Sequence, residues 1–110
     1  MSAPRYDYAG DPLLAPQLAA ALKRVIDPEM SLDVVELGLV YRLEATSEVT
    51  RVRLTMTSAA CPVAEHIVEE MGHELRAARP GVPVDVELVW DPPWMPELMS
   101  APARSAMGWD

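Results

Sequence analysis

Apolar residues recur at helical spacing in two stretches of the chain. In residues 16–26 they fall at i, i+4, i+7 and i+8, and in residues 63–75 they recur every four residues. Each pattern predicts a helix with one apolar face. The first helix is expected to end before Asp27-Pro28, because proline disfavours helical geometry in the preceding residue. The second is expected to run to about Ala78 and to stop at Pro80-Gly81.

Three other stretches alternate apolar and polar residues, which is the period of a half-buried strand. They span residues 34–44, 49–57 and 84–90. The first two are separated by the polar turn Thr46-Ser47-Glu48 and predict a β-hairpin. Gly38 in the first stretch indicates a bulge or a close backbone approach. The residues expected on one face of that strand are Leu37, Leu39, Tyr41 and Leu43.

The two ends of the chain lack such long patterns. Residues 1–15 have no clear period and are expected to form a flexible arm before a domain over residues 16–110. The prolines in residues 90–96 exclude a helix or central strand and favour an extended loop. Ser100, Pro102 and Gly108 have the spacing of the cap, first-turn proline and stop of a short last helix.

Composition and charge restrict the class of protein. The 110 residues suit one domain with a modest core, and 50% of them are apolar, which is typical of a folded globular chain. No apolar run is long enough to cross a bilayer, and no signal peptide is recognised. One cysteine excludes an intrachain disulfide and fits a reducing cytoplasm. The formal charge of −8, without a basic stripe, argues against a nucleic-acid partner.

Cys61, the only cysteine, is predicted at the junction between the second strand and the second helix. It stands at or near the N-cap, and Pro62 takes the first helical position. A thiol there faces unpaired backbone N–H groups and the positive end of the helix dipole, both of which favour the thiolate. A thiolate ligates metals or attacks electrophiles, whereas the alternative is a small buried cysteine that only packs well.

Two other polar groups are candidates for chemistry. The loop of residues 27–33 carries three carboxylates, which could bind a cation, act as acid and base, or be solvated. The carboxylates alone favour solvation. His66, Glu70 and His73 lie at i, i+4 and i+7 of the second helix, a spacing that could hold a metal. Glu and His neighbours on an exposed helix are more commonly just solvated.

Large apolar residues concentrate after residue 90. They either cover the core or form an exposed patch that binds a partner, and the two interpretations are compatible, since Trp and Met are enriched in interfaces. The candidates for partner contact are Trp90, Trp94, Met95 and Met99.

Three segments in this order resemble the metal–sulfur cluster assembly factor family, which includes SufT-like and PaaD-like maturation proteins. Residues 27–29 (DPE) followed by residues 34–41 (VVELGLVY) are similar to its DPE…(I/V)VDLGLVY opening. Residues 55–62 (TMTSAACP) resemble its LT.T…CP segment, and residues 88–94 (LVWDPPW) its V…WDPPW segment. The resemblance covers about residues 16–109. The chain departs from the family pattern at Asp33 and Glu36, where Asn and Asp are common.

The resemblance implies an α+β fold, a small two-layer α/β domain. Two helices would pack on a sheet of about three strands, in the order helix–strand–strand–helix–strand, with a short C-terminal helix after them. It also implies that Asp27, Glu29, Thr57 and Cys61 line one pocket. Ser58 and Glu36 are further candidates for the wall of that pocket.

The resemblance further implies an accessory factor in iron–sulfur cluster assembly or transfer, and not an enzyme, so no catalytic residue is assigned. The expected partners are a client apo-protein, such as a multicomponent oxygenase, or the assembly machinery, with no membrane partner. A cluster usually needs about four thiolates, and one chain supplies one. A cluster or iron would therefore be held transiently and shared in a homodimer, completed by Asp27, Glu29 or a small thiol, or bound together with a recipient.

Two alternatives remain. In a thiol-dependent enzyme, Cys61 would be the nucleophile and Asp27 or Glu29 the proton shuttle, but no histidine is placed to act as a base. In a metal-free adaptor, the cysteine would be inert and the residues of the tail would bind the partner.

Overall fold

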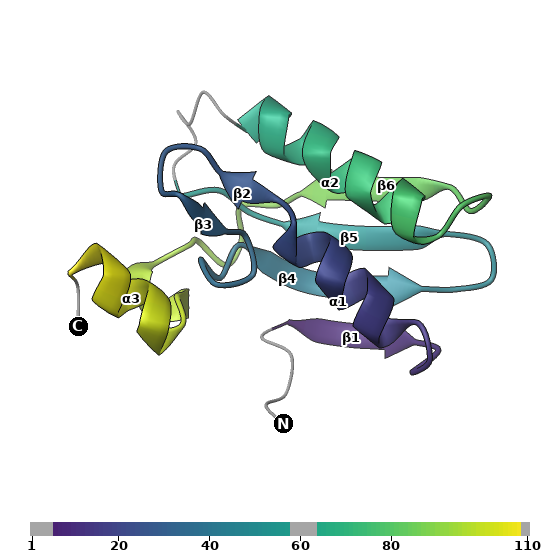
Figure 1. Ribbon diagram of the computed structural model, residues 1–110, viewed down its shortest axis with the longest axis horizontal. Coiled ribbons are helices and arrows are strands. Elements are labelled where there is room, and N and C mark those ends of the chain that lie inside the picture. The colour runs from purple at the N-terminus through teal and green to yellow at the C-terminus, as the bar shows by residue number, and fades with distance from the viewer. Residues whose placement is uncertain (1–5, 58–63, 109–110) are drawn as a thin grey trace.

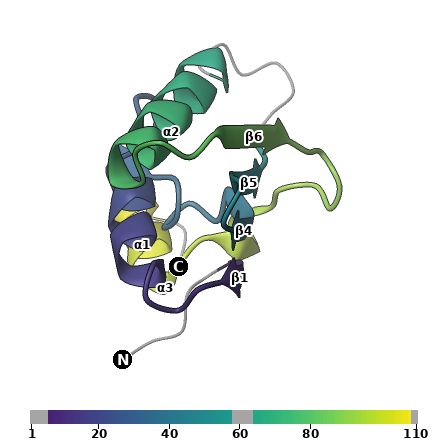
Figure 2. The same ribbon diagram turned by 90° about the vertical axis from the view of Figure 1, so that its right-hand side faces the viewer.

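Two helices cover one face of a four-stranded mixed sheet in the computed structural model, which describes residues 6–57 and 64–108 (Figures 1 and 2). The sheet has the strand order β1-β4-β5-β6, in which the β4–β5 pair is antiparallel and the outer pairs are parallel. The expected two-layer α/β fold is therefore confirmed. The strands of this sheet are β1 (Asp7–Gly10), β4 (Val40–Ala45), β5 (Thr50–Leu54) and β6 (Val84–Leu88). The other elements are α1 (Ala15–Lys23), β2 (Ile26–Asp27), β3 (Leu32–Asp33), α2 (Ala64–Ala78), the 3-10 helix η1 (Pro96–Leu98) and α3 (Ala101–Met107).

The core lies between the helices and the sheet. Both helices bury apolar residues of the predicted stripes, and alternate residues of β4 and β5 meet them from the sheet. The ends of the helices are joined where Arg24 Nε donates to Glu74 Oε1 at 2.7 Å. The buried apolar side chains between the helices and the sheet include Leu18, Leu22, Leu43, Val52, Leu54, Ile67, Met71 and Leu75. In the described part of the chain no helix is long and apolar enough to cross a membrane.

The first helix ends earlier than its apolar spacing predicts. Its last residue is Lys23, not Ile26, because the backbone N–H groups of Arg24 and Val25 close tight turns onto the carbonyls of the last helical turn. Ile26 is then free to pair with Asp33 in the small β2–β3 hairpin. The expected acidic loop is thus partly a hairpin, and Ile26 is exposed instead of buried on a helix face.

The first long strand is shorter than predicted. The alternation was expected to run over residues 34–44, but β4 begins at Val40 and residues 34–39 form turns. The cause is Asp33, whose Oδ1 accepts hydrogen bonds from two backbone N–H groups of the turn at 3.0 Å each. Such local bonds satisfy the backbone without a neighbouring strand.

The side chains of β4 also alternate differently from the prediction. Leu43 is buried as expected, but Tyr41 is only half-buried. The register against β5 shifts between Val40 and Arg42, so one extra residue enters the strand. A bulge of this kind reverses the alternation along the strand, which puts Val40 on the core face in place of Tyr41.

The sheet has a fourth strand where about three were expected. β1 pairs in parallel with β4 and comes from residues that were assigned to a flexible arm. Tyr6 and Tyr8 pack against the core, so the arm interpretation is corrected for these residues. The period-2 spacing of the two tyrosines is the local sign of a strand, but it is too short to predict one.

The C-terminal elements agree with the sequence. The β4–β5 hairpin and β6 occur in the predicted places, but β5 ends at Leu54 and β6 at Leu88, before the predicted residues 57 and 90. The end of α2 at Ala78 is as predicted. Ser100 caps α3 by accepting a hydrogen bond from the N–H of Ala103, and Gly108 ends it in the left-handed conformation. The segment between β6 and η1 is a loop with bends at Asp91 and Pro92, and the Asp91–Pro92 peptide bond is cis.

Candidate functional site

Segments from distant parts of the sequence meet at the end of the sheet where β5 and β6 finish and β4 begins, which we call the carboxyl edge (Figure 1). The β2–β3 hairpin, the 34–39 turn and the start of α2 all lie there. Hydrogen bonds join the 34–39 turn and the ends of the two strands: Leu39 O accepts from the N–H of Thr55 at 2.8 Å, and Leu54 O from that of Val89 at 2.8 Å. Ligand sites in open α/β sheets form outside the carboxyl ends of parallel strands, so this edge is the candidate site.

Asp27 is a buried carboxylate at this edge, with 2% of its surface exposed. Its Oδ1 accepts hydrogen bonds from the backbone N–H groups of Glu29 at 2.8 Å and Met30 at 3.2 Å. Its carbonyl accepts a further bond from Ser31, which has a positive φ of 58°. Asp27 therefore orders the turn that presents Glu29, and the solvated interpretation does not hold for it.

We expect Asp27→Ala to lower the free energy of unfolding by about 1–3 kcal/mol, because two backbone N–H groups lose their acceptor in a partly buried loop. Asp27→Asn keeps an oxygen at the same place and should cost less than about 1 kcal/mol. Urea unfolding measures both changes. Glu48→Ala in the exposed β4–β5 turn is the control, with an expected change within about 0.5 kcal/mol. An equal loss of stability in the Asn and Ala variants would show that the charge of Asp27, and not its role as a hydrogen-bond acceptor, stabilises the fold.

Glu36 joins the 34–39 turn to the C-terminal segment. One carboxylate oxygen accepts a short hydrogen bond from Ser100 Oγ, and the other lies 3.8 Å from Lys23 Nζ. The carbonyl of Glu36 accepts a bond from the N–H of Ser100 at 2.9 Å. These contacts place the N-cap of α3 on the turn, and they give Glu36 a structural role that the sequence does not reveal.

Cys61 and Ser58 lie outside the described residues, as do the predicted N-cap and first position of the second helix. The described residues on either side are Thr57, which is half-buried beyond the end of β5, and Ala64, where α2 begins. The structure thus brings Asp27 and Thr57 to the same edge. The complete pocket with Glu29 and Cys61 stays a prediction.

The large apolar residues of the tail divide into two groups. Trp90 and Met95 are 46% and 47% exposed, so they are available to a partner. Met99 is buried, and Trp94 packs against the core with its Nε1 donating to Leu37 O at 2.7 Å. The inner pair therefore covers the core, as one interpretation predicts. The outer pair is exposed, and its contact with a partner stays a prediction.

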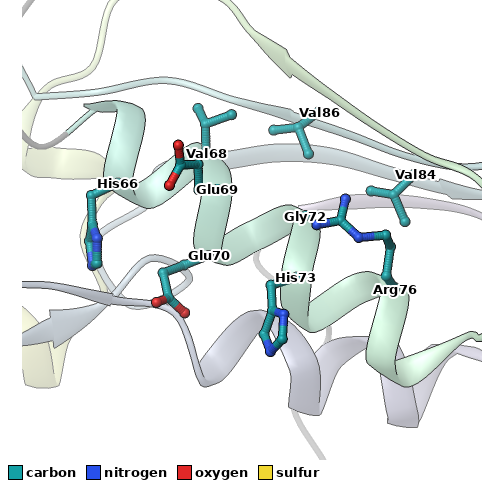
Figure 3. Close-up of a pocket in the computed structure, with 9 residues that line it drawn as sticks. All are labelled: His66, Val68, Glu69, Glu70, Gly72, His73, Arg76, Val84 and Val86. Carbon is teal, nitrogen blue, oxygen red and sulfur yellow. The ribbon is translucent and has the colours of Figure 1, made fainter.

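The histidines of α2 lie beside a cleft between α2 and β6. The cleft has a volume of about 570 Å³, and its lining includes Val84 and Val86 of the edge strand (Figure 3). His66, Glu70 and His73 extend from one side of the helix, but they stay apart along it (Figure 3). In the described part of the chain no three His, Cys, Asp or Glu side chains are grouped so that they could hold a metal ion. The helical spacing therefore marks a polar face.

Comparisons with known proteins find a matching family model and similar proteins. A sequence model described as iron–sulfur cluster assembly protein matches residues 16–88. The chain is 38% identical over 96 residues to the Fe-S protein maturation auxiliary factor YitW of Bacillus subtilis, covering 86% of this chain and 94% of that protein. It is 39% identical over 85 residues to the Fe-S protein maturation auxiliary factor SufT of Staphylococcus aureus, covering 76% and 97%.

The fold is also found among solved structures. A crystal structure of a domain of unknown function from Bacillus anthracis superposes with a TM-score of 0.81 at 40% identity, covering 89% of this chain and 94% of that one. The family model and the two curated relatives include the residues of the carboxyl edge, from the β2–β3 hairpin to the start of α2. The chain belongs to the iron–sulfur cluster assembly protein family.

Proposed function

We propose that the protein is an accessory factor that holds an iron–sulfur cluster or iron transiently and passes it to a client apo-protein. The observation that carries the proposal is the 38% identity to a maturation auxiliary factor over 86% of the chain. Two relatives with this description match nearly their whole length, so the likeness is to the whole domain and not to a shared fragment.

The chemistry of the chain limits how a cluster could be held. Iron–sulfur clusters are usually bound by about four cysteine thiolates, and this chain contains one cysteine. The remaining ligands would come from a second chain, from a small thiol or from the recipient, with Asp27 or Glu29 as oxygen donors. Because one chain supplies only part of the ligand set, the cluster is released more easily. Easy release suits a protein that carries a cluster to others and does not suit one that keeps it as a resident cofactor.

The carboxyl edge suits this role. The segment that contains Cys61 joins the end of β5 to the start of α2, where the helix dipole favours a thiolate. Asp27 lies at the same edge and is ordered by its own hydrogen bonds. A preorganised carboxylate together with a thiolate would be an appropriate donor set for iron that must be held and then surrendered.

Anaerobic reconstitution of the wild-type protein tests the proposal. The protein is incubated with iron and sulfide, with and without glutathione, and desalted before iron and sulfide per chain are measured. It is then mixed with an apo-ferredoxin in the presence of a chelator. A carrier should retain iron and sulfide and convert the acceptor faster than the same amounts of free iron and sulfide.

The opposite result would have a clear meaning. Protein that stays metal-free after reconstitution, with or without the small thiol, would contradict the carrier function. The metal-free adaptor would then be the better interpretation, and its binding surface would include the exposed Trp90 and Met95.

A further inference from the structure

An open cleft of about 530 Å³ lies between the start of β1 and the segment that follows β6. Two tyrosines, Tyr6 and Tyr41, and two carboxylates, Asp7 and Glu97, contribute to its lining. We call it the tyrosine cleft. It is formed by segments that are far apart in the sequence, and most of its residues lie outside residues 16–88, to which the family model matches.

Specific contacts build the cleft. The hydroxyl of Tyr41 donates to Pro92 O at 2.7 Å, which holds the proline-rich loop against β4. Gly38 contributes to the lining and has a φ of 75°, and the carbonyl of Leu98 lies where a Cβ of residue 38 would be. The chain therefore approaches Gly38 as closely as a residue without a side chain allows. The cleft is consequently part of the folded structure and not a gap between mobile segments.

The tyrosine cleft is negatively charged. Its described lining contains no basic residue, and neither Asp7 nor Glu97 forms an ion pair with any basic side chain of the described chain. Arg42, which lies opposite Asp7 on β4, is instead paired with Glu44 at 3.0 Å. Burial raises the pKa of Tyr41 above its usual value, and the negative charge of Asp91 raises this pKa further.

We propose that the tyrosine cleft binds an arginine or lysine side chain of the client protein. A guanidinium or ammonium group is attracted to tyrosine rings and forms charge-assisted hydrogen bonds with carboxylates. An apolar ligand would instead remove water from two carboxylates without replacing the lost interactions. The proposal rests on the proposed function in one respect: that function identifies the client as the protein that contributes the basic side chain.

The cleft between α2 and β6 gives a useful contrast. Its lining contains Arg76 and two histidines together with Glu69 and Glu70 (Figure 3). Because both signs of charge are present, it has no preference for a cation. The preference for a basic side chain is therefore a property of the tyrosine cleft and not simply of the acidic chain.

The position of the tyrosine cleft fits a docking role. It lies at the beginning of β1 and β4, which is the end of the sheet that forms the carboxyl edge (Figure 1). Trp90 and Met95, both about half-exposed, belong to the same loop segment as Pro92. A client that placed a basic side chain in the cleft and apolar residues on this loop would bind at the end of the domain that leads into the Cys61 segment.

The test is an NMR titration of the ¹⁵N-labelled, metal-free protein with acetyl-Gly-Arg-Gly-amide. The comparison ligand is the tripeptide in which citrulline replaces arginine, since citrulline has almost the same shape but no charge. We expect saturable shifts of the amide signals of Asp7, Gly38 and Tyr41 with the arginine peptide, with a dissociation constant in the millimolar range. The citrulline peptide should produce little change.

Variants locate the binding site. Asp7→Asn combined with Glu97→Gln should weaken binding by about tenfold. Glu48→Gln combined with Glu69→Gln changes the net charge equally at exposed positions outside the cleft and should leave the affinity unchanged.

The proposal is overturned if the arginine peptide produces no saturable shift, if citrulline binds equally well, or if the two double variants behave alike. No metal is needed for this measurement. A failure of cluster transfer would therefore contradict the proposed function without affecting the titration, and the absence of peptide binding would not affect cluster transfer.

Discussion

Cys61→Ser is expected to remove nearly all of the iron and sulfide that the reconstituted protein retains, while the domain stays folded. The hydroxyl of serine is not deprotonated at neutral pH and is a poor ligand for iron in clusters, so the only thiolate of the chain is lost. Serine is favourable at a helix N-cap, the position predicted for residue 61. The melting temperature should therefore fall by less than about 8 °C, since a larger fall would mean a loss of over roughly 1 kcal/mol for a domain of this size.

The measurement is iron and sulfide per chain, with the visible spectrum, after anaerobic reconstitution of the wild type and the variant. A second variant, Cys61→Ser with Ser47→Cys, is the matched control. It restores one thiol per chain at an exposed residue of the β4–β5 turn, away from the carboxyl edge. We expect it to remain without a cluster.

Two outcomes would contradict the role of Cys61. If the control regains iron and sulfide, any exposed thiol is sufficient and the position of Cys61 has no special function. If Cys61→Ser keeps the wild-type iron content, the ligands are other residues, and Asp27→Asn becomes the next variant to test because it removes a carboxylate while retaining the turn.

Gly38→Ala is expected to lower the free energy of unfolding by about 3 kcal/mol or more. Its φ of 75° is unfavourable for a residue with a side chain, and an added Cβ would lie 2.2 Å from Leu98 O and 2.6 Å from Leu98 C. Backbone atoms cannot rotate away, so the C-terminal segment must move off the 34–39 turn. The hydrogen bonds from Trp94 to Leu37 and from Ser100 to Glu36 would then be strained or lost.

Gly81→Ala separates the two causes of this loss. Gly81 also has a positive φ, of 83°, but no atom lies within 4 Å of the position that an added Cβ would take. Its substitution should cost only the backbone term of about 1 kcal/mol. In thermal unfolding we expect Gly38→Ala to lower the melting temperature by more than about 10 °C and Gly81→Ala by about 4 °C. Similar losses in both variants would show that the contact with Leu98 is not tight.

The two proposed sites can be changed independently. Asp27 lies at the carboxyl edge, where the sequence predicts Cys61, whereas Asp7 and Glu97 line the tyrosine cleft. A variant of the first pair should lose the cargo and still bind the basic peptide. A variant of the second pair should retain the cargo and bind the peptide more weakly.

Elements with strong local signals were predictable from the sequence. The end of α2 is determined by Pro80-Gly81, and α3 by Ser100 and Gly108, because capping residues and glycine act on their immediate neighbours. The β4–β5 hairpin and β6 follow from short-range alternation between polar turns. The family resemblance rests on similar short segments, and the comparisons confirm it.

Elements that depend on distant partners were predicted incompletely. β1 is a strand because β4 offers it an edge, and its four residues carry too little pattern to show this alone. The turn at residues 34–39 replaces a strand because the side chain of Asp33 satisfies its backbone, although its apolar residues alternate as in a strand. Periodicity identifies which residues are buried, but it does not identify their hydrogen-bond partners.

Residue types and local spacing are properties of the sequence, and they predict one cysteine at a strand-to-helix junction and carboxylates in a loop before the hairpin. Local pattern does not show that Asp27 is buried, that Glu36 secures α3, or that Asp7, Tyr41 and Glu97 share one cleft, because these follow from the folded chain. These residues are separated by up to about ninety positions in the chain. They meet because burial of the apolar core brings their strands and loops together, and that packing is a property of the whole chain.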